Sequence, residues 1–468
     1  MVFANLIFLY IFLPLNLLLY FVTKNKAWRN AVLIAFSLFF YAWGEPVWIT
    51  LLLFSAIIDY CHGRIIEGHR GQWQAKAAVA SSLILNLGLL ATFKYSGFIV
   101  ENINALLGTG FGVPSFGLPI GISFYTFQTI SYTIDVYRGE VAAQKNFSKF
   151  LMYVSSYHQL VAGPIVRYSD VAREIEDRQT TAKDFSEGVT KFCIGLAKKV
   201  MVANVAGQMV SRYLDGDLTK LSVAGAWFGV LMFSIQLYYD FSGYSDMAIG
   251  LGRIFGFHYP TNFNYPYISK SVTEFWRRWH MTLGSFFRDY VYIPLGGNRK
   301  HQWLNIAVVW FLTGLWHGAS WNFILWGVYY GVLLMIEKLF LLKWLKKIPA
   351  VFARAYALLA AVVGWAIFYV TDMERLGYLL SVMFGFSGAA LGDLQLTITL
   401  QNNMFWLIAA VVFCVPITQW IKGRVNALPD DKQALCHSCA AVMNAGILFL
   451  CTAMLVGQSY NPFLYFRF

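Results

Sequence analysis

The sequence contains few charged residues for its length. Only 13% of its 468 residues are Asp, Glu, Lys or Arg, whereas 58% are hydrophobic. Roughly a quarter of the residues in an average soluble domain are charged, so this composition excludes an ordinary soluble protein. We therefore expect a membrane protein. Its spanning elements should be helices, because a helix satisfies all its backbone hydrogen bonds within one segment.

Cysteine is also scarce. The chain has 6 cysteines, and most of them lie in apolar runs. Cys436 and Cys439 enclose His437 in a CHSC segment, but a zinc site needs further ligands at matching spacing, and the sequence offers none. The sequence also lacks internal repeats, a heptad array and the nucleophile elbow of a soluble hydrolase. We expect no metal site and no tightly bound cofactor.

Apolar segments near the length of a membrane span recur along the whole chain. They predict one all-α, polytopic domain over residues 1–468, with roughly ten to twelve transmembrane or re-entrant helices. The first segment lacks the leader and cleavage site of a signal peptide, and we expect it to be a retained first helix. The predicted segments are Val2–Val22, Ala31–Tyr41, Val47–Tyr60, Ala78–Phe93, Leu118–Ile134, Phe192–Val210, Val223–Tyr239, Leu304–Leu315, Phe323–Ile336, Ala355–Val370, Met404–Trp420 and Ala440–Val456.

The net charge of +12 is distributed as a membrane topology predicts. If the N-terminus is extracytoplasmic and the loops alternate sides, most Lys and Arg residues fall in cytoplasmic loops, in agreement with the positive-inside rule. The charge is therefore a topology signal, and we expect no nucleic-acid partner. This topology places both chain ends outside the cytoplasm. The cytoplasmic loops are residues 23–29, 62–77, 138–149, 167–199, 253–301, 338–354 and 422–432.

Two histidines stand out in the central part of the chain. The first, His280, lies in the segment EFWRRWHMTLGSFFRDYVYIPLGGNRK, which begins at Glu274. On a continuous helix, Trp276, His280 and Phe287 would share one face. A surface helix with snorkelling arginines accounts for the cations of this segment. It gives no reason for a histidine on the buried face.

The second histidine, His317, lies in the apolar hairpin 304–336, between Trp316 and Gly318. A neutral imidazole costs less at membrane depth than a permanent charge and suits a general base. A histidine that only packs is the alternative, but function is favoured. Gly314 and Gly318, four residues apart, predict close approach of another helix or of a ligand.

Five cations near His280 are candidates for binding the phosphates of a donor. Backbone amides near Gly296 and Gly297 are further candidates, although this signal is weak by itself. The cations are Arg277, Arg278, Arg288, Arg299 and Lys300.

Two carboxylates occur at membrane depth in the segment YYDFSGYSD. Asp240 and Asp246 are costly there without a partner, so they either orient catalytic groups or hold basic residues in place. Trp316 and Asn322, beside the second histidine, are expected to support the site.

Four motifs give the chain a resemblance to the membrane-bound O-acyltransferase family. It most resembles the bacterial branch that acetylates exopolysaccharides such as alginate. The motifs define a core at about residues 119–336. They are LVAGPIVRY (Leu160–Tyr168), YYDFSGYSDMAIGLGRIFGF (Tyr238–Phe257), FWRRWHMTLGSFFRDYVYIPLGGNR (Phe275–Arg299) and GLWHGASWNFILWG (Gly314–Gly327).

The resemblance implies that His317 is the essential histidine and His280 the second one. It also implies a central tunnel, acetyl-CoA as a cytosolic donor substrate, and location in the cytoplasmic (inner) membrane. His317 would deprotonate the acceptor hydroxyl, and His280 would polarise the thioester carbonyl or orient the site. The ending FLYFRF resembles a motif of this branch, in which Tyr465 is either a transient acyl carrier or an interface anchor.

The sequence leaves the acceptor and the exact activity open. Since the chain has no soluble esterase-like domain, we expect an extracytoplasmic acetyltransferase of the SGNH/esterase type as a partner, together with membrane lipid. The related D-alanyl transferases of teichoic acid share RRWH and WHG but usually lack IPLGGNR, which favours acetyl transfer. D-alanyl-type transfer to a cell-wall polymer and a non-catalytic acetyl or anion transporter are the alternatives.

Overall fold

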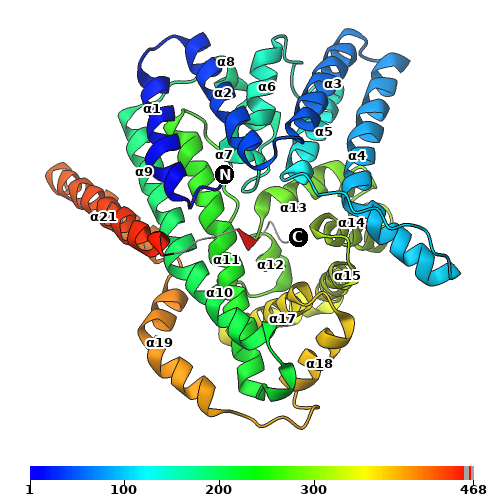
Figure 1. Ribbon diagram of the computed structural model, residues 1–468, viewed down its shortest axis with the longest axis vertical. Helices are drawn as coiled ribbons and strands as arrows, with labels where there is room; N and C mark the ends of the chain where they lie inside the picture. Colours follow the sequence, from blue (N-terminus) through cyan, green and yellow to red (C-terminus); the bar gives the residue numbers. More distant parts are fainter. Residues whose placement is uncertain (458–462, 465–468) are drawn as a thin grey trace. The chain divides into compact units, whose positions relative to one another are not determined.

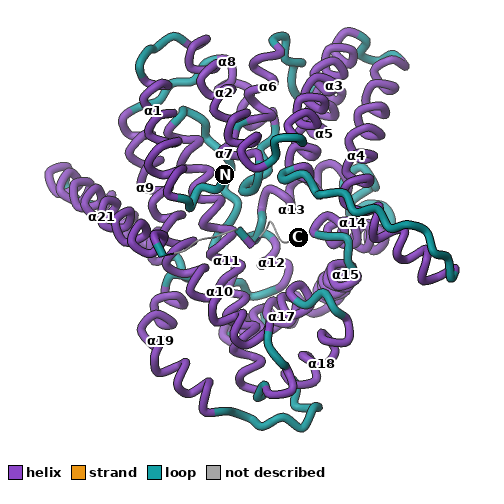
Figure 2. The backbone as a smooth tube through the Cα atoms, viewed as in Figure 1, coloured by secondary structure: helices purple, strands orange, loops and turns teal. Residues whose placement is uncertain are grey.

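The computed structural model describes residues 1–457, 463 and 464. Within this part the chain consists of helices and connecting loops, with no strand (Figure 2). The prediction of an all-α membrane protein is confirmed. The number of crossings and the central tunnel stay predictions.

The chain divides into two compact units. Among the described residues, the first comprises 1–192, 244–260, 455–457, 463 and 464, and the second comprises 193–243 and 261–454. Three helices contribute residues to both units: α9 (Ala182–Ala197), α11 (Val223–Ile254) and, through its last two residues, α21 (Asp430–Val456). That residues 1–468 form a single domain stays a prediction.

The first unit begins with a short π-helix and continues through eight α-helices (Figure 1). Helices α3, α4 and α5 lie side by side. A polar network joins them, in which Asp59 of α3 accepts hydrogen bonds from Ser82 and Asn86 of α4, and the Ser82 hydroxyl lies 3.2 Å from that of Thr133 in α5. The helices are η1 (Phe8–Phe12), α1 (Leu13–Phe21), α2 (Lys26–Gly44), α3 (Ile49–Gly68), α4 (Trp73–Leu107), α5 (Ile122–Arg138), α6 (Phe147–Ser155), α7 (Tyr157–Leu160) and α8 (Tyr168–Glu176).

The second unit carries both histidines of interest. Many of its helices are short, and several contain a π-helical turn. The helices are η2 (Lys198–Ala203), α10 (Asn204–Val210), η3 (Ser211–Asp215), η4 (Leu218–Lys220), η5 (Pro266–Ile268), α12 (Val272–Trp276), α13 (Met281–Phe287), η6 (Arg288–Tyr292), α14 (Gln302–His317), α15 (Trp321–Ile336), η7 (Glu337–Leu341), α16 (Leu342–Leu345), α17 (Ala350–Tyr369), α18 (Met373–Met383), α19 (Leu394–Val412), α20 (Ile417–Asn426) and α21 (Asp430–Val456).

Among the described residues, five helices are long and apolar enough to cross a membrane, or up to six if a bent pair counts as one span. Many of the other predicted segments correspond to helices that are short or interrupted. The five are Ile49–Gly68, Trp73–Leu107, Trp321–Leu345, Ala350–Tyr369 and Ser438–Val456.

Proline interrupts two of the predicted segments. The segment Leu118–Ile134 becomes helical only at Ile122, because Pro119 and Gly121 precede it. Gly121 has φ +81°, and an added Cβ would lie 2.8 Å from the carbonyl oxygen of Leu160. The segment Met404–Trp420 is broken before Pro416, where α19 and α20 meet at an angle of 61°.

Buried Glu337 fixes the start of α12. Its two carboxylate oxygens accept hydrogen bonds from the backbone amides of Val272 and Thr273, at 2.6 and 2.8 Å. The first amides of a helix have no partner within it, so a carboxylate here satisfies them and interacts favourably with the helix dipole. Glu337, which directly follows α15, thereby links that helix to the start of α12, the helix that precedes His280.

Candidate active site

His317 is the last residue of α14, at the turn of the α14–α15 hairpin. The two helices approach closely because glycines face each other. A Cβ at Gly314 would clash with the carbonyl oxygen of Phe323, and one at Gly327 would clash with that of Trp310. The close approach expected at Gly314 is therefore confirmed, and the neighbour is α15.

Aromatic rings surround the imidazole of His317, which is only 8% exposed. The rings of Trp326 and Phe368 stand edge-on to it, with centroids 5.0 and 5.1 Å away. Asn322 holds the end of α17, since its side-chain amide donates to the backbone carbonyls of Ile367 and Phe368. Asn322 thus supports the ring that packs on His317.

His280 is buried, as predicted, but it does not lie on a continuous helix. The prediction of one helical stripe through it is wrong, because α12 ends at Trp276 and α13 begins at Met281. His280 itself has φ +43°, in the left-handed region. The backbone amide of Met281 donates to the carbonyl oxygen of Asn262 at 2.9 Å, so a tertiary hydrogen bond replaces a helical one.

The hydrogen bonds of Asn262 set the tautomer of His280. The Oδ1 atom of Asn262 lies 3.0 Å from Nδ1 of His280 and accepts from the hydroxyl of Thr282 at 2.9 Å. Since this oxygen accepts from both sides, Nδ1 carries the proton and Nε2 carries a lone pair. Burial lowers the pKa of His280 well below its ordinary range, so the ring is neutral.

The Nε2 atom of His280 is buried and has no hydrogen-bond partner among the described residues. A buried polar atom without a partner is costly and is often found at functional sites. In this tautomer the atom accepts a hydrogen bond or a proton and cannot donate. The neutral ring can therefore orient a group but cannot polarise a carbonyl.

Trp316 connects the two histidines. Its ring centroid lies 5.0 Å from that of His317 and 5.8 Å from that of His280. The structure thus brings both predicted histidines against one buried indole. Among the described residues, no group of three or more His, Cys, Asp or Glu converges into a metal site.

Two of the five candidate cations are neutralised by carboxylates. The guanidinium of Arg278 pairs with Glu274 at 2.9 Å, and that of Arg288 pairs with Asp289 at 2.6 Å. Both pairs reduce the charge available to an anionic ligand.

Arg277, Arg299 and Lys300 are exposed and pair with no carboxylate of the described residues. These three cations are the better candidates for contact with phosphates. Lys338 lies near Arg277, and its ammonium donates to the Oδ1 of Asn298 at 3.2 Å. Positive charge therefore gathers around the loop that follows η6.

Hydrogen bonds within this loop occupy the amides of both glycines. The amides of Gly296 and Gly297 donate to the carbonyls of Ile293 and Tyr292. Buried Asn305 closes the loop by donating to the carbonyls of Gly297 and Lys300. The loop therefore uses these two amides internally, and the prediction that backbone amides near them hold phosphates stays a prediction.

Asp240 and Asp246 each pair with a lysine. In the second unit, Asp240 lies 2.5 Å from Lys199, and both side chains are 4% exposed. In the first unit, Asp246 lies 2.8 Å from Lys191, in a more exposed pair. Both contacts match the expectation that these carboxylates hold basic residues.

Tyr465 lies outside the described residues. Its neighbours Phe463 and Leu464 are described and buried. The ring of Phe463 packs edge-on against Tyr244, with centroids 4.4 Å apart, within the first unit.

Sequence reasoning missed Asn262 and Phe368. Phe368 is one of many aromatic residues in the chain, and nothing marks it locally as a neighbour of a histidine. Asn262 lies in the segment YPTNFNYP, where it looks like an ordinary turn residue. Only the tertiary structure shows that it fixes an imidazole.

Comparison with known proteins gives a consistent result over the whole chain. The sequence model of the membrane-bound O-acyltransferase family matches residues 140–381. A probable alginate O-acetylase of Azotobacter vinelandii is 37% identical over 504 residues, covering 100% of both chains. A peptidoglycan O-acetyltransferase of Helicobacter pylori is 30% identical over 520 residues, covering 100% of this chain and 98% of the relative.

A teichoic acid D-alanyltransferase of Bacillus subtilis matches a shorter region. It is 30% identical over 245 residues, which cover 49% of this chain and 60% of the relative. The chain belongs to the membrane-bound O-acyltransferase family, in the branch that contains the alginate O-acetylases, and is a membrane-embedded acyltransferase.

Proposed function

We propose that the chain moves an acetyl group from cytosolic acetyl-CoA across the inner membrane, for O-acetylation of an extracytoplasmic polysaccharide. The full-length relatives named as O-acetylases and O-acetyltransferases support this activity. The observation that carries the proposal is the placement of two buried histidines against one indole, with the Nε2 of His280 unpartnered.

His317 acts as the general base. Its neutral imidazole takes the proton from the acceptor hydroxyl as the hydroxyl oxygen attacks the thioester carbonyl. The carbon–sulfur bond then breaks, and the CoA thiolate recovers a proton from the imidazolium. Such proton transfer typically contributes 10²–10⁴-fold to a rate.

His280 orients the reacting groups. Because Asn262 holds its Nδ1–H, the Nε2 atom accepts a hydrogen bond from the acceptor hydroxyl or from an amide of the donor. Arg277, Arg299 and Lys300 contact the phosphates of the donor, since no carboxylate of the described residues neutralises them.

The acceptor is either Tyr465 or a serine of a separate extracytoplasmic esterase-like acetyltransferase, which completes the transfer to sugar. In the first case Tyr465 is a transient acyl carrier. D-alanyl transfer to a cell-wall polymer is the second candidate function. It is supported by the similarity of about half of this chain to the teichoic acid D-alanyltransferase.

Proteoliposomes test both the donor and the direction. Acetyl-CoA with a labelled acetyl group is supplied to one face only, and a soluble acetyl acceptor is enclosed on the other. We expect label to reach the enclosed acceptor at a rate that depends on the protein, with release of CoA on the donor side. Labelled D-alanine on a carrier protein serves as the competing donor. Transfer from that carrier without transfer from acetyl-CoA would replace the proposal with the second candidate.

A further inference from the structure

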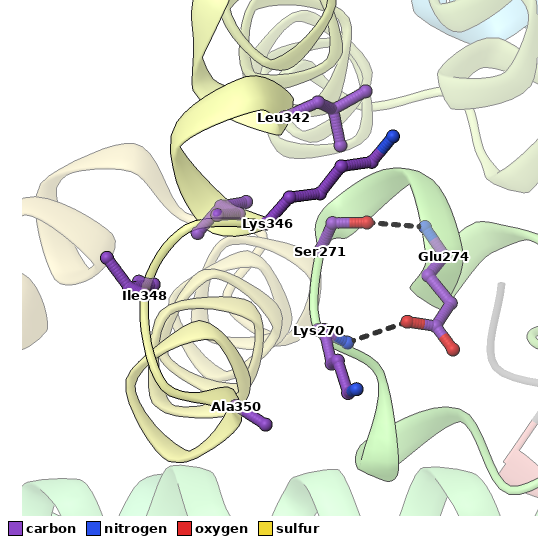
Figure 3. A pocket seen from close by; sticks show the side chains of 8 residues that line it. Lys270, Ser271, Glu274, Leu342, Lys346, Ile348 and Ala350 are labelled. Carbon is purple, nitrogen blue, oxygen red and sulfur yellow. Dashed lines mark hydrogen bonds between the residues drawn. The ribbon is translucent and has the colours of Figure 1, made fainter.

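A cavity of about 370 Å³ in the second unit is lined by neither of the two histidines. Figure 3 shows its two walls: Lys270, Ser271 and Glu274 on one side, and Leu342, Lys346 and Ile348 on the other. The first wall belongs to the start of α12, and the second to α16 and the turn after it.

The cavity lies at the end of two membrane spans. The candidate spans Trp321–Leu345 and Ala350–Tyr369 are joined by the four residues 346–349, and this turn contributes to the cavity wall. Trp344 and Phe352, on either side of the turn, are 67% and 66% exposed. Exposed aromatic residues at the ends of spans are typical of the headgroup level of a bilayer.

The cavity has an uncompensated positive charge. The carboxylate of Glu274 is already bound, because it accepts from the backbone amide of Lys270 at 2.9 Å and pairs with Arg278 at 2.9 Å. The exposed ammonium groups of Lys270 and Lys346 pair with no carboxylate of the described residues. Ser271 accepts from the amide of Glu274, which leaves its hydroxyl hydrogen available as a donor.

The remaining lining is apolar. Leu342 and Ile348 flank Lys346, so cationic and aliphatic groups meet within one cavity. A soluble anion would use only the lysines. A phospholipid uses both, because its phosphate lies between the ammonium groups while its glycerol and upper acyl carbons contact the aliphatic side chains.

We propose that this cavity binds the headgroup of an anionic phospholipid. Lys270, Lys346 and the hydroxyl of Ser271 hold the phosphate, and the aliphatic wall holds the lipid backbone. The bound lipid links the start of α12, which leads to His280, to the turn between two spans. By the positive-inside rule this lipid belongs to the cytoplasmic leaflet.

Native mass spectrometry of the detergent-solubilised full chain tests the proposal. Phosphatidylglycerol and phosphatidylcholine with identical acyl chains are titrated separately. We expect saturable binding of phosphatidylglycerol at least tenfold tighter than that of phosphatidylcholine. Equal affinity for the two lipids would overturn the proposal.

A pair of double variants locates the site. Lys270→Ala with Lys346→Ala should weaken phosphatidylglycerol binding roughly thirtyfold, since each lysine near an anionic headgroup contributes about 1 kcal/mol. The control, Lys343→Ala with Lys347→Ala, removes two cations from the same region that do not line the cavity. It should change affinity less than threefold. Equal losses in both double variants would contradict a specific site.

Competition on the unmodified protein separates the lipid from a donor phosphate and does not depend on variant folding. Coenzyme A and dephospho-coenzyme A are added to the phosphatidylglycerol complex. We expect neither to displace the lipid. Displacement by coenzyme A at micromolar concentration, but not by the dephospho form, would assign the cavity to the donor and overturn the proposal.

Discussion

The Nδ1 atom of His280 lies 3.0 Å from the Oδ1 atom of Asn262, and this contact leaves the Nε2 atom of the ring as a buried acceptor. The same asparagine accepts from the hydroxyl of Thr282, which fixes the orientation of its amide. Asn262 is therefore a positioning residue for His280. It determines which nitrogen can meet a substrate.

Replacement of Asn262 tests this role. Asn262→Leu leaves the Nδ1–H of His280 buried without an acceptor, which costs about 1–3 kcal/mol. We expect roughly a 5- to 150-fold loss of acetyl transfer, measured as CoA release by the purified protein.

The control variant Asn262→Asp keeps an acceptor and should retain most activity. Its carboxylate also raises the basicity of the ring, so the acid limb of the pH–rate profile should move to higher pH. Equal losses in both variants with unchanged pH profiles would indicate a purely structural role.

The buried pair Lys199–Asp240 predicts a large effect on stability. Both side chains are nearly inaccessible, so Lys199→Ala leaves a buried carboxylate without its partner. Such a loss typically costs 3–5 kcal/mol. The matched control is Lys191→Ala, because the Lys191–Asp246 pair is more exposed and should contribute less than about 1 kcal/mol. Thermal unfolding in detergent compares the two variants. Equal shifts in Tm would contradict the prediction that the buried pair contributes more to stability than the more exposed pair.

His258 predicts a pH-dependent contribution to stability. Partial burial lowers its pKa, but hydrogen bonds to Glu174 and Asp184 outweigh this effect and raise the pKa above the ordinary value of 6.5. The protonated ring therefore stabilises the folded state fully below pH 6.5. This contribution is lost as pH rises through the raised value.

The variant His258→Gln measures that contribution. We expect the difference in Tm between the unmodified protein and the variant to be larger at pH 6 than at pH 9. The difference should be small, because the ring is half exposed. A Tm difference that grows with pH would contradict the predicted direction of this pH dependence.

The sequence carried enough information for the helical class, the membrane location and the hairpin that holds His317. These features depend on composition and on local patterns, such as apolar runs and glycines spaced four apart. The pairing of Arg278 with Glu274 also had a local signal, since the two residues lie four apart on a helix.

The geometry around His280 had no such signal. A helical pattern continues through Trp276 and Phe287, and it is broken by tertiary hydrogen bonds from the segment that contains Asn262 and Asn264. The partner of Asp240 was equally hidden, because Lys199 lies on a different helix. Contacts between distant segments depend on how helices pack, and the pattern within one segment does not report this.

The central claim is that the two buried histidines perform the acyl transfer. The most direct measurement is the initial rate of CoA release from acetyl-CoA by the purified, folded protein with an acceptor present. We predict that His317→Ala lowers this rate by about 10²–10⁴-fold. The control variant His301→Asn should retain the full rate, because His301 is exposed and asparagine tolerates its φ of +48°. If His317→Ala, shown to be folded by its unchanged Tm, retained the full rate, the catalytic assignment would be contradicted.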